Sequence, residues 1–205
     1  MTKRDIYLKA IRNEKVDTLV WAPNFDYWLR VNSNEGTLPE KYRGMSRNDI
    51  VRAINGYIWN RASGMKIAYD KTVKTKIIDN EEQTITQIST PVGTVTAVHK
   101  RTEGRFRSKH LSEHFIKNVE DIKTMRYIAE SMNFVPDYEG TLKALKETGD
   151  DGIVLNTFFA IPFIQFAKND AGYVNAFYLW FDHKKEVHLL INVYSKKFLE
   201  ALKIL

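Results

Sequence analysis

Residues 16–46 read VDTLVWAPNFDYWLRVNSNEGTLPEKYRGMS, and this stretch decides the fold that we predict for the chain. It begins with a short apolar run, Thr18–Ala22, which Pro23 ends because proline has no N–H to donate to a neighbouring strand. A buried strand of this length is typical of a parallel sheet. A carboxylate, a guanidinium and three aromatic rings follow the run directly. In a β/α barrel they would lie at the carboxyl end of the first strand, where such barrels build their sites.

The polar and aromatic side chains just past this run are the first candidates for a substrate-binding site. The later stretch Gly152–Phe158 reads GIVLNTF, is predicted to be another strand, and adds two polar residues. A packing role is the alternative for every one of these residues, since an aromatic ring at a barrel mouth can simply fill space. No catalytic residue follows from the sequence. The candidate substrate-binding residues are Asn24, Asp26, Tyr27, Trp28, Arg30, Asn156 and Thr157.

In residues 72–101 apolar and polar residues alternate with a period of two. Val73, Thr75 and Ile77 alternate with lysines, and polar turns near residues 80–82 and 91–93 divide the segment. This pattern predicts two or three antiparallel strands. Because a plain βα repeat contains no such piece, we interpret residues 72–101 as an insertion that covers the mouth or rim of the barrel.

Helix signals frame the rest of the chain. Thr2 and Ser46 are each followed three residues later by an aspartate, which is typical of helix N-caps. The apolar face after Ser46 predicts a helix to about Arg61, and we interpret Met65–Tyr69 as a second barrel strand. Further helices are expected at residues 118–132, capped by Asn118, at 137–149, capped by Asp137 and ended by Gly149, at 172–181, and from Asp182, as the cap, to near the last residue.

Four stretches occur in a characteristic order and spacing: VDTLVWAP followed by GTLPEKYRGMS, then STPVGT at 89–94, then NVEDIKTMRYIAESMNFVPDYE, then GDDG at 149–152. Together they resemble the uroporphyrinogen decarboxylase superfamily over essentially the whole chain, and most closely its methyltransferase-like and uncharacterised branches. The resemblance implies an α/β fold, an incomplete (β/α)8 barrel of the TIM type with the antiparallel insertion at 72–101. Residues 1–205 would form a single domain, the N-terminal half of the barrel.

The expected barrel is larger than this chain. A barrel of this kind needs about 250 residues, and the sequence offers only about four βα units plus the insertion. We therefore expect the chain to be the N-terminal half of a longer protein, or a truncated relative of one. An open sheet edge invites pairing with another chain, so we expect self-association, most simply as a two-fold dimer.

The decarboxylases of this superfamily carry Arg-Gln-Ala-Gly-Arg-Tyr-Leu-Pro-Glu-Tyr after the first strand, and the arginines hold substrate carboxylates. The matching stretch is Ser33–Tyr42, where Thr37 stands at the place of the second arginine and no arginine stands at the first. The family's Phe-Ser-Asp-Ile stretch, whose aspartate binds pyrrole N–H groups, has no counterpart within Asn60–Met65. Decarboxylation of uroporphyrinogen in tetrapyrrole biosynthesis is therefore an alternative rather than the main expectation.

The main expectation is methyl transfer linked to a corrinoid. Relatives on this side of the superfamily move a methyl group between a corrinoid and a thiol or another acceptor, using zinc held by a His-x-Cys pair and a later cysteine. This chain has no cysteine, so we expect no cofactor within it, and zinc and a corrinoid partner only for the full-length protein. The substrate would be a small molecule or a corrinoid protein. An inactive half-barrel that serves as an assembly module is the non-enzymatic alternative.

Composition excludes several other classes. Without cysteine the chain forms no disulfide and has no cysteine nucleophile, which suits a cytoplasmic protein. No window approaches ~18 uninterrupted apolar residues, so no membrane span is expected. The net charge is +6, but we interpret the basic stretch His99–His110 as a solvated loop and predict no nucleic-acid binding. His110 and His114 have a spacing that suits a metal on a helix, yet their segment is predicted to be extended, so we predict no metal site.

Overall fold

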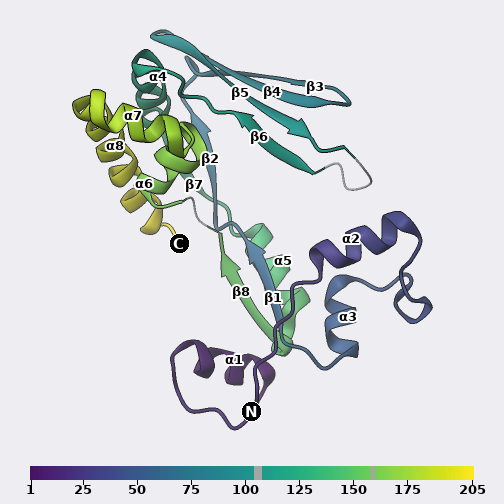
Figure 1. Ribbon diagram of the computed structural model, residues 1–205. Coiled ribbons are helices and arrows are strands. Elements are labelled where there is room, and N and C mark those ends of the chain that lie inside the picture. The colour runs from purple at the N-terminus through teal and green to yellow at the C-terminus, as the bar shows by residue number, and fades with distance from the viewer. Residues whose placement is uncertain (104–107, 158–159) are drawn as a thin grey trace. The chain divides into compact units, whose positions relative to one another are not determined.

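The computed structural model describes residues 1–103, 108–157 and 160–205 (Figure 1). The chain divides into two compact units, and each is built from two separate segments. The first unit comprises Met1–Gly64 and Asp137–Thr157, and the second comprises Met65–Pro136 and Phe158–Leu205. The expected mixed α/β composition is confirmed, with small parallel and antiparallel sheets, and the described residues form no closed barrel.

The first unit is organised around a pair of parallel strands. Strands β1 (Ile58–Ala62) and β8 (Gly152–Asn156) pair in register from Ile58 opposite Gly152 to Ala62 opposite Asn156. Helix α5 (Glu139–Thr148) contacts both strands, and the short turn η2 (Gly149–Asp151) leads from it into β8. The remaining elements precede β1: α1 (Lys3–Ile11), α2 (Asp26–Glu35), η1 (Glu40–Tyr42) and α3 (Arg47–Ala53).

The prediction for the start of the barrel is wrong. Thr18–Ala22 forms no strand, and its described backbone bond to the rest of the unit runs from the Tyr57 N–H to the Trp21 carbonyl at 2.8 Å. Leu19 is 84% exposed, so the run is not buried as a central strand would be. The parallel strand is β1 instead, inside the segment predicted to be helical to Arg61. Helix α3 ends before Asn55, whose φ of 57° reverses the chain in the left-handed region.

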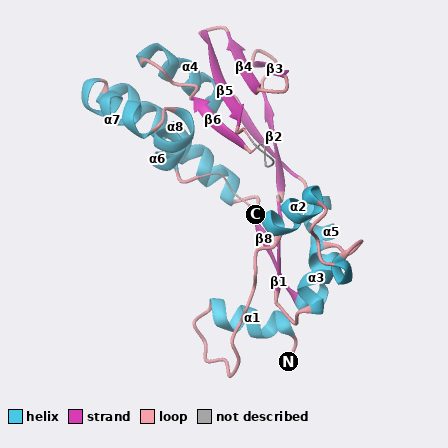
Figure 2. Cartoon of the chain, turned by 45° about the vertical axis from the view of Figure 1, so that its right-hand side comes forward, coloured by secondary structure: helices cyan, strands magenta, loops and turns pink. Residues whose placement is uncertain are grey.

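The second unit contains two antiparallel sheets. Strand β2 (Met65–Tyr69) pairs with β7 (Met132–Pro136), so Met65–Tyr69 is a strand as predicted but is not a parallel barrel strand. A four-stranded sheet runs in the order β3–β4–β5–β6 (Figure 2). Its first three strands confirm the antiparallel prediction for residues 72–101. Their bounds are β3 (Lys74–Asp79), β4 (Gln83–Thr90), β5 (Gly93–Arg101) and β6 (Lys109–Glu113).

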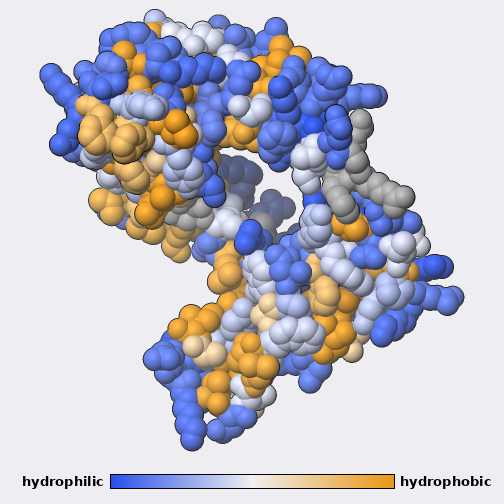
Figure 3. Space-filling view, in the orientation of Figure 1, coloured by the Kyte–Doolittle hydropathy of each residue, from blue (hydrophilic) through white to orange (hydrophobic). Residues whose placement is uncertain are grey.

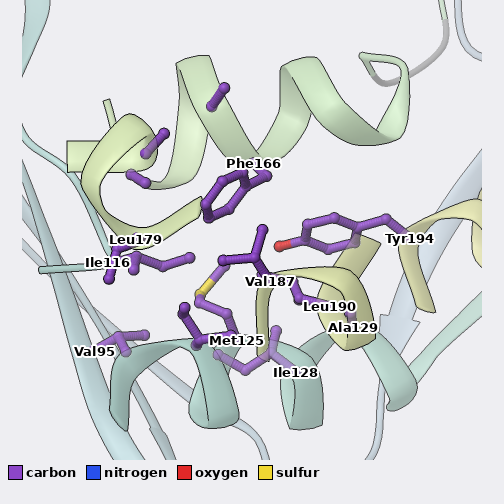
Figure 4. Close-up of a cluster of buried hydrophobic side chains, with 14 residues drawn as sticks. Val95, Ile116, Met125, Ile128, Ala129, Phe166, Leu179, Val187, Leu190 and Tyr194 are labelled. Carbon is purple, nitrogen blue, oxygen red and sulfur yellow. The ribbon is translucent and has the colours of Figure 1, made fainter. Parts of the chain in front are cut away.

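Helices cover one side of these sheets and supply most of the core. The helical elements are α4 (Val119–Glu130), α6 (Pro162–Ile164), the π-helical turn η3 (Gln165–Asp170), α7 (Tyr173–Asp182) and α8 (Lys184–Leu202). Figure 4 shows the core of this unit, where Met125 and Ile128 of α4 meet Val187 and Leu190 of α8. Phe166 of η3 is fully buried among them. Full burial of such a side chain contributes about 2 kcal/mol.

The capping predictions have mixed outcomes. Asn118 accepts hydrogen bonds from the backbone of Glu120 and Asp121 and starts α4, which confirms its role, and Gly149 ends α5 as predicted. Asp137 and Asp182 do not cap helices, because α5 follows Tyr138 and α8 follows His183, each without a side-chain cap. Of the basic stretch, residues 104–107, including Arg105 and Arg107, lie outside the described residues, as does Phe158 after β8.

Candidate functional site

The candidate residues after Pro23 lie on α2 and the turn before it, rather than at the end of a strand. The Asn24 side chain accepts a hydrogen bond from the Asp26 N–H at 3.0 Å, which orders the start of the helix. Asp26 forms an ion pair with Arg47 at 3.3 Å, and the Arg30 guanidinium lies 5.6 Å from the centre of the Tyr27 ring.

Trp28 contacts two other aromatic rings. Its ring meets Phe25 edge-on at 5.4 Å and Tyr42 at 6.0 Å between ring centres. These three rings pack α2 against the turn η1. Tyr27 and Arg30 are both exposed at the surface of the first unit.

The other two candidates lie at the carboxyl end of the parallel pair: Asn156 is the last residue of β8 and Thr157 follows it. The N–H and the hydroxyl of Thr157 both donate to the Ala62 carbonyl, at 2.7 and 3.1 Å. This double contact holds the chain beside the end of β1 after β8 has ended. Asn156 is exposed at the same edge, so its amide is accessible to a ligand.

Sequence reasoning missed a polar network on the first unit. The Arg47 guanidinium donates to the Asn60 side chain, to the Trp59 carbonyl at 3.2 Å and to Asn48 at 2.9 Å. Asn60 in turn donates to the Thr148 hydroxyl of α5 at 2.7 Å. A shallow polar hollow of about 550 Å³ opens here, but its arginines are already paired. The hollow is lined by Ser46, Arg47, Asn48, Asp49, Arg52, Asn60 and Glu147.

A different kind of cavity lies within the second unit. It measures about 250 Å³, its wall is mostly apolar, and a few polar groups converge on it. An apolar pocket with a small number of converging polar groups is the usual form of a small-molecule site. Its lining residues are Ile67, Tyr69, Ile88, Phe115, Met125, Ile128, Met132, Ala160, Gln165, Asp170, Tyr194 and Lys197.

The carboxyl group of Asp170 is the chemical centre of this pocket. Asp170 is only 3% exposed. One carboxyl oxygen accepts the hydroxyl of Tyr194 at 2.7 Å and the other accepts the amide of Gln165 at 2.8 Å. Burial raises the pKa of Asp170 to about 7, although both hydrogen bonds act in the opposite direction. At neutral pH this group therefore exchanges between its neutral and its charged form.

The partners of Asp170 are held by the local fold. Gln165 and Asp170 begin and end the single π-helical turn η3, a form of helix that occurs frequently at functional sites. The Asp170 carbonyl also accepts the Ile116 N–H at 2.8 Å. Tyr194 reaches into the core from α8 (Figure 4), and burial together with the nearby carboxyl raises its pKa well above the ordinary value. Tyr194 is therefore a neutral donor to Asp170.

The sequence carries a weak signal for this pocket. Gln165 and Asp170 are spaced five residues apart in the otherwise largely apolar stretch around Phe166, but a single aspartate there reads as a surface residue. None of the predicted site residues belongs to the pocket.

Comparisons of the chain with protein-family models, with curated proteins and with solved structures found no match. Within residues 1–103, 108–157 and 160–205, no helix is both long and apolar enough to cross a membrane. In that same part of the chain, no three histidine, cysteine, aspartate or glutamate side chains come together as metal ligands would.

Proposed function

We propose that this chain is the N-terminal portion of a barrel protein similar to uroporphyrinogen decarboxylase, on the corrinoid-linked methyltransferase side of that superfamily. The observation that carries the proposal is the parallel pairing of β1 with β8, with α5 against both strands. A helix that leads into a parallel strand, as α5 leads into β8, is one part of the repeat from which such a barrel is built. The order of the sequence motifs that resemble the family supports the same assignment.

In this proposal the carboxyl end of the β1–β8 pair is the substrate-facing edge. Thr157, held by the Ala62 carbonyl, fixes the backbone there, and the exposed Asn156 offers both a hydrogen-bond donor and an acceptor. An amide group of this kind can form hydrogen bonds with the polar side chains that surround a corrinoid ring. The corrinoid would supply the methyl group, and a thiol would accept it.

Zinc does not enter the role that we assign to these residues. Thiolate ligands would have to come from outside the sequence, since the chain has no cysteine. The contribution of the described residues is to bind and orient the methyl donor.

Binding of methylcobalamin to the purified chain tests this proposal, measured by equilibrium dialysis and by quenching of tryptophan fluorescence. We expect saturable binding that Asn156→Ala weakens about five- to tenfold, because a lost hydrogen bond costs about 1 kcal/mol. Asn192→Ala, an exposed asparagine on α8, is the matched control and should bind as the wild type does.

Three results would count against the proposal. Binding that does not saturate, or that both variants retain equally, would remove Asn156 and its edge of the sheet from any corrinoid site. Conversion of uroporphyrinogen to coproporphyrinogen at enzymatic rates under anaerobic conditions would favour the decarboxylase alternative. That alternative has little support locally, because the Thr37 hydroxyl donates to Asn32 at 2.8 Å where the family's second arginine would stand.

A further inference from the structure

The buried carboxyl of Asp170 has no basic partner among the described residues. Its two hydrogen bonds come from the neutral donors Gln165 and Tyr194. Lys197 also lines the pocket, but its ammonium donates to the Met132 carbonyl at 2.8 Å and pairs with Glu200 at 3.1 Å. A buried carboxylate without a cation is unfavourable, because burial removes water from the charge and two hydrogen bonds from neutral donors replace only part of that hydration.

The geometry leaves room for a partner at this carboxyl. Each carboxylate oxygen can accept about two hydrogen bonds, and each already accepts one from a side chain. The remaining acceptor positions belong to a group that lines a cavity of about 250 Å³. A water molecule occupies about 30 Å³ of liquid, so the cavity holds a molecule of roughly eight non-hydrogen atoms.

We propose that this pocket binds a small apolar molecule that carries one protonated amine. The ammonium would donate to the free acceptor positions of Asp170, and the apolar part would lie against the walls formed by Phe115, Met125 and Ile128. A charged amine supplies the missing cation, whereas a carboxylate ligand would meet a like charge. This inference concerns the second unit alone and does not depend on the proposed corrinoid site.

The titration of Asp170 gives the binding a distinct dependence on pH. The other titratable groups at the pocket are Tyr69 on β2 and Tyr194 and Lys197 on α8. Burial raises the pKa of both tyrosines above the ordinary value of 10.0, so neither tyrosine becomes charged between pH 6 and pH 8. With a pKa of about 7, Asp170 is about one-tenth ionised at pH 6 and about nine-tenths ionised at pH 8. The apparent affinity for an amine should therefore rise about tenfold over this range, since only the charged form is competent to bind.

Three probes of matched shape test the proposal by isothermal titration calorimetry: benzylamine, benzyl alcohol and benzoate. We expect benzylamine to bind more tightly than the neutral alcohol at pH 8, benzoate to bind least, and the preference for the amine to decline toward pH 6. Asp170→Asn should lower the affinity for benzylamine at least tenfold and abolish the pH dependence of that affinity. Asp182→Asn, an exposed aspartate at the end of α7, is the control and should change neither.

A second variant keeps the test decisive if Asp170→Asn fails to fold, which circular dichroism would reveal. Tyr194→Phe removes a donor that lowers the pKa of Asp170, so the pH at which amine binding is half-maximal should move upward. Equal binding of the three probes, binding of none, or a pH profile that neither variant changes would overturn the proposal. Asp170 would then be only a structural anchor for the turn η3.

Discussion

Replacing Gly152 by alanine tests the pairing of β1 with β8 at its closest point. The backbone of Gly152 is extended, so alanine could adopt its conformation without strain. The obstacle is space. A Cβ on residue 152 would lie 2.5 Å from the carbonyl carbon of Ile58 and 2.8 Å from its Cα, and nearer still to the carbonyl oxygen, whereas ordinary contact begins at 3.4 Å. The two strands would have to separate by about 1 Å or more at this register, which no hydrogen bond between them tolerates.

The expected destabilisation follows from these displacements. Overpacking costs about 1–3 kcal/mol, and each ladder hydrogen bond lost near residue 152 adds about 1 kcal/mol. We expect Gly152→Ala to lower the free energy of unfolding of the first unit by about 3 kcal/mol or more. Urea denaturation followed by circular dichroism measures the loss, and hydrogen exchange of the amides in β1 and β8 locates it.

Gly140→Ala is the matched control for this experiment. Gly140 lies in α5, and an added Cβ there meets nothing within 4 Å. Alanine at an exposed helical position should stabilise the chain by about 0.5–1 kcal/mol. If Gly152→Ala unfolds at the same urea concentration as the wild type, with unchanged protection of β1, then the strands are not paired as described and the reasoning about this edge fails.

Two further predictions concern the second unit. Leu190→Ala should lower the free energy of unfolding, measured by urea denaturation, by about 2–5 kcal/mol, because Leu190 is fully buried in the core. Leu189 is 40% exposed on the same helix, so Leu189→Ala should lower it by less than ~1 kcal/mol. Equal losses would contradict the described orientation of α8. The second prediction is that Asp170 makes the stability depend on pH. Its carboxyl has a pKa of about 7 in the folded protein, against an ordinary value of 3.8. The stability that it contributes is therefore fully present below pH ~4, falls as the pH rises to about 7, and stays level above that. The difference in unfolding free energy between the wild type and Asp170→Asn should therefore change between pH 4 and pH 7, and a difference that stays constant over that range would show that Asp170 is not buried as described.

The sequence predicts an element correctly where the interactions that form it lie within one short segment. The capping box at Asn118 needs only Asp121, three residues on, and the alternation in residues 74–101 needs only the strand's own period. These signals depend on no distant partner, so they predict helix α4 and the antiparallel strands β3, β4 and β5 directly.

Sequence reasoning failed where distant residues decide the outcome. Thr18–Ala22 is as apolar as a buried strand, but no strand pairs with it and Leu19 faces solvent. Ile58 and Trp59 continue the helical spacing of α3. The turn at Asn55–Gly56 nevertheless separates these two residues from the helix, and Ile58 pairs with Gly152 in a sheet. The dipeptide Asn-Gly favours a turn, but our prediction followed the apolar periodicity instead.

The pocket at Asp170 was out of reach for the same reason. Its carboxyl becomes buried because Tyr194, 24 residues later, donates to it, and because side chains of β2 close the wall. In the sequence an aspartate beside Asn169 and Gly172 has the character of a surface turn. Only the assembled second unit shows that it is surrounded by apolar groups.

The interleaving of the two units has a consequence for how the protein is made. Ala62 and its hydrogen-bond partner Thr157 are 95 positions apart in the sequence, and the whole of β2 to β7 is synthesised between them. At about 5–20 residues per second, β1 would leave the ribosome roughly 5–20 s before β8 exists to pair with it. Until then β1 has no parallel strand to pair with. The nascent chain thus offers an unpaired strand for several seconds, which is the interval in which a chaperone that recognises extended apolar segments would bind it.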